Sequence, residues 1–236
     1  MSSPSSGNRL KKAIAYSRGA FYWTIKSIAW PVTHAYVRLR VIGVENVPRS
    51  GRCIVVANHA SFADAIVLGS AFPRRIAFMI TGPIYRLRRL TWFYYMMGTI
   101  PVASGEADPS AMRAALRTLR DGGVIGIFPE GQRMSDGALG EGKAGAAMLA
   151  ARSGSSVIPA ALIGTRHVMP VGVLLPRPHR VRVVFGRPLR FTAQAGRRPT
   201  RQEIDHFTRE LMKAIAGLME GERSAGGAAG TVTTSS

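Results

Sequence analysis

Short apolar runs alternate with helical segments along the middle of the chain, and this alternation limits the folds open to it. Glycine, proline or polar residues separate the segments, as expected for strands and helices joined by loops. The predicted strands are 53–57, 76–80, 124–128, 157–163 and 180–185, and the predicted helices are 64–72, 109–120, 143–152 and 200–219. Such an order predicts an α/β domain in three layers, in which helices flank a central, largely parallel mixed sheet.

The two ends of the chain differ from this core in composition. Residues 1–10 are rich in serine, and residues 222–236 lead into a low-complexity stretch of small residues. Both ends are predicted to be disordered because they have little apolar surface to bury. Between them we expect a helical segment at 11–40 and one folded domain at 41–221, which is long enough for a sizeable core.

The chain is strongly basic, with 32 Lys and Arg residues against 13 Asp and Glu residues and a formal net charge of +19. So large a charge implies a polyanionic neighbour, either nucleic acid or an anionic membrane face. Aromatic and apolar side chains accompany the bases at 20–30 and 86–97. Tryptophan and tyrosine prefer the headgroup level of a bilayer, so we expect a membrane surface and no nucleic acid.

The segment 11–40 is predicted to be an interfacial helical anchor. Its longest apolar stretch, 19–30, carries Lys26 and is stopped by Pro31, which makes it shorter than the ~20 apolar residues of a membrane span. No small-residue cleavage site of an export signal follows it. The expected location is therefore peripheral or monotopic, at the cytoplasmic face of the cell membrane. The single cysteine, Cys53, fits a reducing compartment.

A polar motif follows directly after the predicted strand 53–57 and reads Asn-His-Ala-Ser-Phe-Ala-Asp over residues 58–64. The carboxyl end of a buried strand is where open α/β sheets place ligand chemistry. If His59 lies in the turn and Asp64 in the first helical turn, the carboxylate can hold one imidazole nitrogen and leave the other free as a base. Ser61-x-x-Asp64 is also a capping box, so Asp64 is equally suited to capping the helix, and the two roles can coexist.

A second polar motif follows the predicted strand 124–128 and reads Phe-Pro-Glu-Gly-Gln-Arg over residues 128–133. Gly131 allows close approach of the backbone, and the planar guanidinium of Arg133 suits a phosphate group. Glu130 is one of the few acids in a basic chain, and we expect it to order neighbouring bases or bind a hydroxyl. The alternative is an ordinary Pro-Gly turn followed by a solvated arginine.

Together the two motifs resemble those of the glycerolipid acyltransferases, the family typified by 1-acyl-sn-glycerol-3-phosphate acyltransferase. Residues 58–64 match the family's Asn-His-x-x-x-x-Asp motif, and residues 128–133 match its Phe-Pro-Glu-Gly-x-Arg motif. The segments 98–102, 143–145 and 157–160 look like the remaining family motifs in order and spacing. The resemblance covers roughly residues 36–190 and identifies 41–221 as the acyltransferase domain.

The resemblance implies transfer of a fatty acyl group from acyl-CoA or acyl carrier protein to a free hydroxyl of a lyso-glycerophospholipid. The simplest acceptor is 1-acyl-sn-glycerol-3-phosphate, which would give phosphatidate. His59 would be the general base, and Asp64 would orient and stabilise its imidazolium. No metal, no redox cofactor and no acyl-enzyme is implied. The substrate-binding residues that the resemblance implies are Asn58, Glu130, Gly131, Arg133 and Lys143.

The sequence departs from the family pattern at two positions where the family often carries a positive charge. Ser104 stands where many members have arginine, and Thr81 stands where many have lysine. Either other cations replace them, or the acceptor is a lyso-lipid with a different head group. The candidate replacements are Arg86, Arg88, Arg89 and Lys143. A basic nucleic-acid-binding protein and a non-catalytic lipid-binding relative are the alternatives from other classes.

Overall fold

A computed structural model describes residues 6–81, 90–103, 108–134, 137–170, 175–192 and 197–228. In this part of the chain, seven strands form one sheet in the order β1-β7-β6-β2-β5-β3-β4. Most neighbouring strands are parallel, whereas β7 is antiparallel to β6 and parallel to β1. The strands are β1 (Arg40–Ile42), β2 (Cys53–Ala57), β3 (Ile76–Thr81), β4 (Ile100–Val102), β5 (Val124–Ile127), β6 (Ser156–Ile163) and β7 (Arg182–Phe185).

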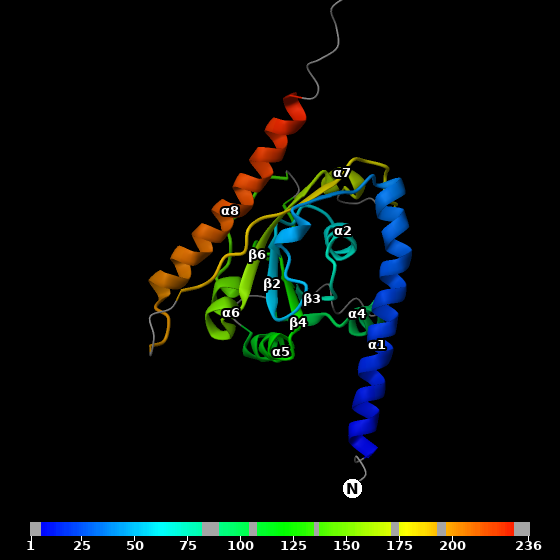
Figure 1. Ribbon diagram of the computed structural model, residues 1–236, viewed down its shortest axis with the longest axis vertical. Helices are drawn as coiled ribbons and strands as arrows, with labels where there is room; N and C mark the ends of the chain where they lie inside the picture. Colours follow the sequence, from blue (N-terminus) through cyan, green and yellow to red (C-terminus); the bar gives the residue numbers. More distant parts are fainter. Residues whose placement is uncertain are drawn as a thin grey trace, which may run out of the picture.

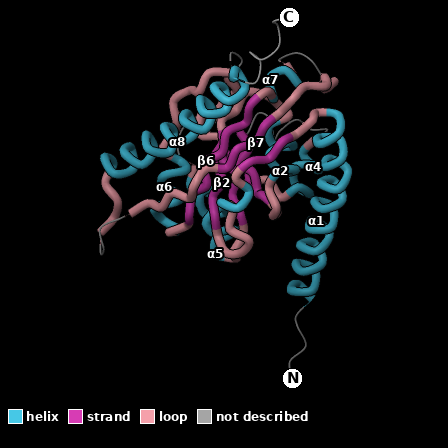
Figure 2. The backbone as a smooth tube through the Cα atoms, turned by 45° about the horizontal axis from the view of Figure 1, so that its top comes forward, coloured by secondary structure: helices cyan, strands magenta, loops and turns pink. Residues whose placement is uncertain are grey.

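Helices cover both faces of the sheet (Figures 1 and 2). On one side lie α1 (Ser6–Pro31), α2 (Asp64–Ala71) and α4 (Thr91–Met97). On the other side lie α5 (Pro109–Arg120), α6 (Gly145–Ser153) and α8 (Arg201–Ala228), while the short α7 (Thr165–Val168) follows β6. The prediction of a largely parallel mixed sheet between flanking helices is therefore confirmed.

The central strand β2 shows why the sequence needs unbroken apolar runs. All five of its residues are buried. Cys53, Val55 and Ala57 pack in the core on the α2 side, whereas Ile54 and Val56 pack in the core formed with α5, α6 and α8. Successive side chains of a strand point to opposite faces, so a strand covered on both faces has no position for a polar residue.

The predicted elements agree with the structure to within two residues at each end, with one exception. Helix α8 continues to Ala228, past position 222 where the disordered tail was expected to begin. Helix α1 likewise begins at Ser6, inside the stretch 1–10 that was expected to be disordered. Adding a residue to an existing helix needs no new nucleation, so long helices extend into segments that the local pattern does not favour. Residues 1–5 and 229–236 lie outside the described residues.

Helix α1 is packed on the domain. The Tyr22 side chain is buried, and its hydroxyl accepts a hydrogen bond from the backbone N–H of Ile76 at 3.2 Å. The Lys26 ammonium donates to the carbonyl of Phe72 at the carboxyl end of α2. Pro31 ends the α-helix as predicted, but the chain keeps turning through a π-helical segment at Val32–Tyr36.

The strand directions decide which loops meet at the carboxyl edge of the sheet. Strands β2 and β5 are parallel neighbours, with Val56 opposite Ile127. The loops that follow them therefore leave the sheet side by side. Because β1 and β7 run against the central strands, their amino ends lie at this same edge.

Gly126 of β5 provides a test of the packing between β5 and β3. A Cβ at this position would lie 2.6 Å from Ile76 Cγ2 and 2.6 Å from Phe78 Cδ1. We expect Gly126→Ala to lower the free energy of unfolding by about 1–3 kcal/mol, measured by urea denaturation, because the extra methyl group overpacks the core.

Gly145→Ala is the matched control, since a Cβ there meets nothing within 4 Å. We expect this substitution to raise the free energy of unfolding by about 0.5–1 kcal/mol, because alanine restricts the unfolded chain. Equal effects of the two substitutions would contradict the packing argument.

Candidate active site

The two residues of the first motif that were predicted to meet do so in the structure. His59 follows β2, and Asp64 is the first residue of α2. The imidazole Nδ1 lies 2.8 Å from Asp64 Oδ2. The carboxylate is fully buried, whereas 16% of the His59 side chain is exposed. The buried acid thus holds an imidazole that substrate can still reach.

Asp64 also fixes the turn that carries the histidine. The same oxygen, Oδ2, accepts hydrogen bonds from the backbone N–H groups of Ala60 and Ser61, both at 2.7 Å. The bond from Ser61 is the reach-back half of a capping box. The forward bond goes to Ala63, whose N–H lies 3.2 Å from Ser61 Oγ. Asp64 therefore holds the imidazole and also closes the turn that leads into α2, although Ala63 is the residue at the N-cap of the helix.

The geometry determines which imidazole nitrogen is free. An ionised carboxylate only accepts hydrogen bonds, so the proton shared with Asp64 belongs to Nδ1, and Nε2 keeps its lone pair. The ring is stacked on Phe128, with centroids 4.2 Å apart and planes at 16°. Phe128 is in turn stacked on Phe78 of β3 at 5.9 Å. The sequence analysis missed this aromatic stack, for which the local signal was Phe128, the apolar residue that directly follows β5.

The loop after β5 holds the backbone of His59 at both of its polar groups. Glu130 Oε1 accepts the His59 N–H at 3.0 Å, and the N–H of Met134 donates to the His59 carbonyl at 2.8 Å. Glu130 is buried. Burial raises the pKa of its carboxyl group, and the hydrogen bond from His59 opposes that rise. The carboxylate therefore orders the base through its backbone.

Gly131 and Lys143 lie against each other beside this loop. Gly131 has a φ of +69°, and a Cβ on it would lie 2.6 Å from Lys143 Nζ. The N–H of Lys143 donates to the Pro129 carbonyl at 2.8 Å. The positive φ favours glycine at this position, and the absence of a side chain lets the lysine lie directly over the loop. The exposed Lys143 places a cation next to the loop that holds His59.

Arg133 joins the two motifs. Its guanidinium carbon lies 3.5 Å from the centroid of the Phe62 ring, which belongs to the turn between His59 and Asp64. Arg133 Nη1 is buried, and it has no hydrogen-bond partner among the described residues. A stacked guanidinium with an unused donor is suited to a phosphate oxygen.

Asn58, for which the resemblance implies substrate binding, is hydrogen-bonded to the neighbouring strand β6. Its Nδ2 donates to the Leu162 carbonyl at 3.0 Å, and its Oδ1 accepts the Leu162 N–H at 2.7 Å. The buried amide therefore continues the pairing of β2 with β6 by one more residue. Because its oxygen and one of its N–H groups are used in this way, Asn58 supports the site by holding the end of β2.

The remaining predicted positions lie apart from the imidazole or outside the described residues. Thr81 is the last residue of β3, at the same edge of the sheet. Cys53 begins β2 at the opposite edge, where burial raises the pKa of its thiol. Ser104, Arg86, Arg88 and Arg89 lie outside the described residues.

These features define a class of protein. A mixed α/β sheet carries, at its carboxyl edge, an imidazole base held by a buried carboxylate, with Arg133 and Lys143 on the loop after β5. Such a site is suited to removing a proton from an alcohol during group transfer.

Comparison with known proteins identifies the family. A family model described as Acyltransferase matches residues 38–163, and the chain belongs to this acyltransferase family. The chloroplastic 1-acyl-sn-glycerol-3-phosphate acyltransferase of Arabidopsis thaliana is 31% identical over 180 residues, which are 74% of this chain and 50% of the relative. The corresponding protein of Bacillus subtilis is 25% identical over 181 residues, which are 76% of this chain and 87% of the relative.

The chain spans about half the length of the chloroplast relatives that it matches, which come from Arabidopsis thaliana and Brassica napus. The fold is similar to that of the crystal structure of the 1-acyl-sn-glycerophosphate acyltransferase from Thermotoga maritima. That likeness has a TM-score of 0.67 at 23% identity and covers 88% of this chain and 82% of the other. The family resemblance carried by the two motifs is confirmed.

Glu130→Gln tests whether the carboxylate acts through the backbone of His59. The glutamine oxygen can still accept the His59 N–H, but it carries no charge. Burial raises the pKa of Glu130, so the ionised carboxylate lowers the free energy of unfolding at pH values above this raised pKa. The loss disappears as the pH falls below the ordinary pKa of a glutamate, because the group is then protonated in the folded and the unfolded protein alike. We expect Glu130→Gln to raise the free energy of unfolding at pH 7 and the gain to vanish in acid, measured by urea denaturation across pH.

Glu130→Ala is the comparison variant. It leaves the His59 N–H without its acceptor, and we expect it to lower the free energy of unfolding by about 1–3 kcal/mol. If glutamine destabilised the protein as much as alanine, the charge and not the hydrogen bond would be the important feature.

Proposed function

We propose that this chain is an O-acyltransferase that moves a fatty acyl group from a thioester donor to the free hydroxyl of 1-acyl-sn-glycerol-3-phosphate. The observation that carries the proposal is the hydrogen bond between His59 Nδ1 and Asp64 Oδ2, which leaves Nε2 free at the carboxyl edge of the sheet. The relatives from Arabidopsis thaliana and Bacillus subtilis, which are named as acyltransferases for this acceptor, support the choice of substrate.

The reaction follows from the free nitrogen. His59 Nε2 takes the proton of the acceptor hydroxyl while the oxygen attacks the thioester carbonyl. The new C–O ester bond forms, the C–S bond breaks, and the departing thiolate takes the proton back from the imidazolium. Asp64 stabilises the imidazolium between these two proton transfers. No covalent acyl-enzyme is needed, and the buried Cys53 at the opposite edge of the sheet takes no part.

The acceptor phosphate would bind to Arg133 and Lys143. Arg133 offers its unused Nη1 donor, and Lys143 lies exposed over Gly131. Phosphatidate is the product expected when the acceptor carries only a phosphate. Thr81, at the end of β3, stands where many family members have a lysine. A lyso-lipid with a different head group is therefore the second acceptor class to be tried.

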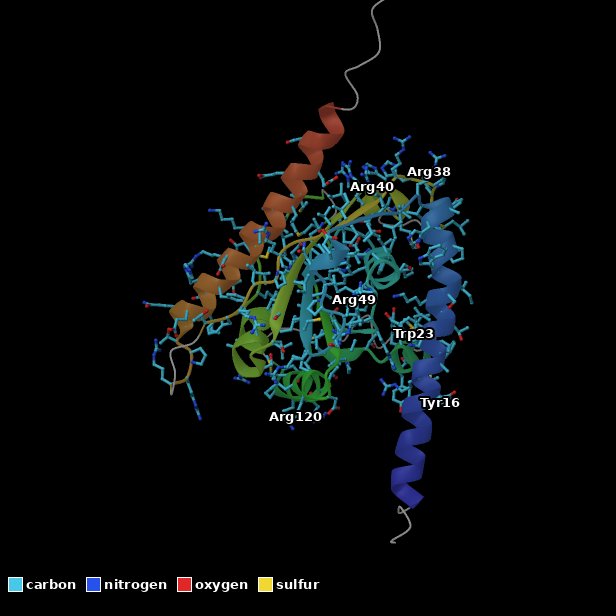
Figure 3. All side chains as sticks on the ribbon, in the orientation of Figure 1. Tyr16, Trp23, Arg38, Arg40, Arg49 and Arg120 are labelled. Atoms are coloured by element: carbon cyan, nitrogen blue, oxygen red, sulfur yellow. The ribbon has the colours of Figure 1, made fainter. Side chains whose placement is uncertain are left out.

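An aromatic stripe on α1 supports binding at a membrane surface. Tyr16, Trp23 and Trp30 recur every seven residues, so they share one face of the helix, and all three are exposed. Figure 3 shows Tyr16 and Trp23 on α1 at the edge of the molecule. Helix α4 packs beside α1, with the Phe21 and Trp92 rings 5.9 Å apart, and Trp92 is itself exposed.

Among the described residues, no helix has the length and apolar character needed to cross a membrane. Because of its exposed aromatic side chains, we propose that the α1 and α4 surface lies in the headgroup region as a peripheral or monotopic contact at the cytoplasmic face. Lys26 lies next to the aromatic stripe, with its ammonium 5.2 Å from the centroid of the Trp23 ring. The same ammonium donates to the Phe72 carbonyl, and burial lowers its pKa.

His59→Ala and Asp64→Asn test the proposed reaction. With acyl-CoA or acyl carrier protein as donor and a panel of lyso-lipids as acceptors, we expect phosphatidate from 1-acyl-sn-glycerol-3-phosphate, identified by mass spectrometry. His59→Ala removes the base and should abolish turnover. Asp64→Asn should reduce it by about a hundredfold or more, because general-base catalysis is worth about 10²–10⁴. Circular dichroism shows whether the variants remain folded, and ordinary turnover by folded His59→Ala would refute the mechanism.

The double variant Tyr16→Ser/Trp30→Ser tests the aromatic stripe. We expect it to bind phosphatidylglycerol vesicles about tenfold more weakly in sedimentation, because two exposed aromatic side chains no longer enter the interface. Val44→Ser, which removes an exposed apolar residue outside α1 and α4, is the control and should bind like the parent protein. Unchanged binding of the double variant would show that this stripe does not contact lipid.

A further inference from the structure

A basic cleft opens at the carboxyl edge of the sheet, next to the catalytic turn. It has a volume of about 1120 Å³, and Asn58 and Ala60, the two neighbours of His59, contribute to its lining. Gly137 also lines it, and its N–H donates to the carbonyl of Met134, whose own N–H is bound to the His59 carbonyl. The cleft therefore shares its wall with the base, although the imidazole itself does not line it.

The topology of the sheet concentrates arginines in this cleft. Strands β1 and β7 begin at the edge where β6 ends, because β7 is antiparallel to β6. Arg40 is paired in register with Arg182, which is in turn opposite Ile163 at the end of β6. The arginines of the lining are Arg38, Arg40, Arg166, Arg180 and Arg182.

Among the described residues that line the cleft, arginines outnumber carboxylates. Of these lining residues, Glu222 is the one carboxylate, and its Oε2 lies 3.2 Å from Arg182 Nε. Arg166 donates to His167 Nε2 at 3.0 Å. Desolvation, together with the coulombic effect of Arg166 and His179, lowers the pKa of His167. So much like charge in one cavity favours binding of an anion with several charges.

Two further features indicate a ligand site. Arg38 has a φ of +49°, a conformation that costs free energy in any residue with a Cβ and that is found preferentially at binding sites. Thr165 is fully buried in the lining, and its Oγ1 has no hydrogen-bond partner among the described residues. A buried hydroxyl normally has a partner, so a ligand atom would complete this site.

We propose that this cleft binds the phosphate-bearing nucleotide end of an acyl-CoA donor, an assignment that rests on the proposed acyl transfer. The nucleotide end of CoA carries a diphosphate and a 3′-phosphate, which together match several arginines. The cleft is a concavity of the size that encloses a small molecule, whereas the surface of a carrier protein is convex. The flexible pantetheine arm then leads past the 58–60 turn to the imidazole. The single phosphate of the acceptor has separate cations in Arg133 and Lys143.

Direct binding tests the cleft without any need for turnover. CoA and adenosine 3′,5′-bisphosphate are titrated into the full chain by calorimetry. We expect the double variant Arg40→Gln/Arg180→Gln to raise the Kd of both ligands by about tenfold or more, since charge-assisted hydrogen bonds to phosphate are lost.

The control for total charge is Arg113→Gln/Arg120→Gln on the exposed face of α5. Figure 3 shows Arg120 at the end of the molecule opposite to Arg38 and Arg40. This variant should bind like the parent protein. Absence of CoA binding to the parent protein, or equal weakening by the two double variants, would overturn the proposal.

Arg38→Gly separates a structural role from a binding role. Glycine adopts a positive φ without strain, so we expect the Tm to rise while CoA binding weakens. A higher Tm with unchanged CoA binding would remove Arg38 from the proposed site.

Kinetics with a truncated donor locate the effect on the reaction. We expect Arg40→Gln/Arg180→Gln to raise the KM for acyl-CoA by about tenfold and to leave the KM for acyl-pantetheine unchanged, because the shorter donor lacks the nucleotide. Equal KM changes for the two donors, or turnover with acyl carrier protein alone, would refute the assignment. If the variant loses CoA binding but still transfers the acyl group from acyl-pantetheine, the cleft binds the donor and takes no part in the reaction itself. If the parent protein binds CoA but transfers an acyl group from no donor, the proposed function is refuted and the CoA site is not.

Discussion

The site depends on one buried oxygen atom. Asp64 Oδ2 accepts hydrogen bonds from the imidazole of His59 and from the N–H groups of Ala60 and Ser61. A carboxylate is costly to bury, and hydrogen bonds from several donors offset that cost. The same bonds close the turn and begin α2, so a change that moves the base also changes the local fold. Catalytic geometry and helix initiation are therefore not independent properties of this turn.

The strand order supplies the contacts that hold the backbone on either side of the imidazole. Because β5 lies beside β2, Glu130 and Met134 reach the N–H and the carbonyl of His59. Because β6 lies on the other side, Asn58 is anchored to Leu162. The base is thus fixed by its side chain from one direction and by its backbone from two others. Such support on rigid strands limits the movement of a catalytic group.

The sequence predicted the features that depend on short stretches of chain, namely the central strands and the contact between His59 and Asp64. The apolar runs located β2, β5 and β6, and the spacing of His59 and Asp64 allowed their contact. Strands β1 and β4 were not predicted, because three residues are too few to show a period. The partners of Asn58 and Glu130 depend on which strands are neighbours, which no short stretch of sequence encodes. The sequence therefore could not show that the Asn58 amide and the Glu130 carboxylate are bound to the protein's own backbone, and their contact with substrate stays a prediction.

Helix α1 is an integral part of the folded domain. Tyr22 caps the N–H at the start of β3, and Lys26 closes the last turn of α2, the helix whose first residue is Asp64. If the outer face of α1 rests on lipid, this bracing sets the height and tilt of the imidazole above the bilayer. The depth to which α1 inserts into the headgroup region would then determine the distance that an acceptor hydroxyl must move out of the bilayer to reach the imidazole.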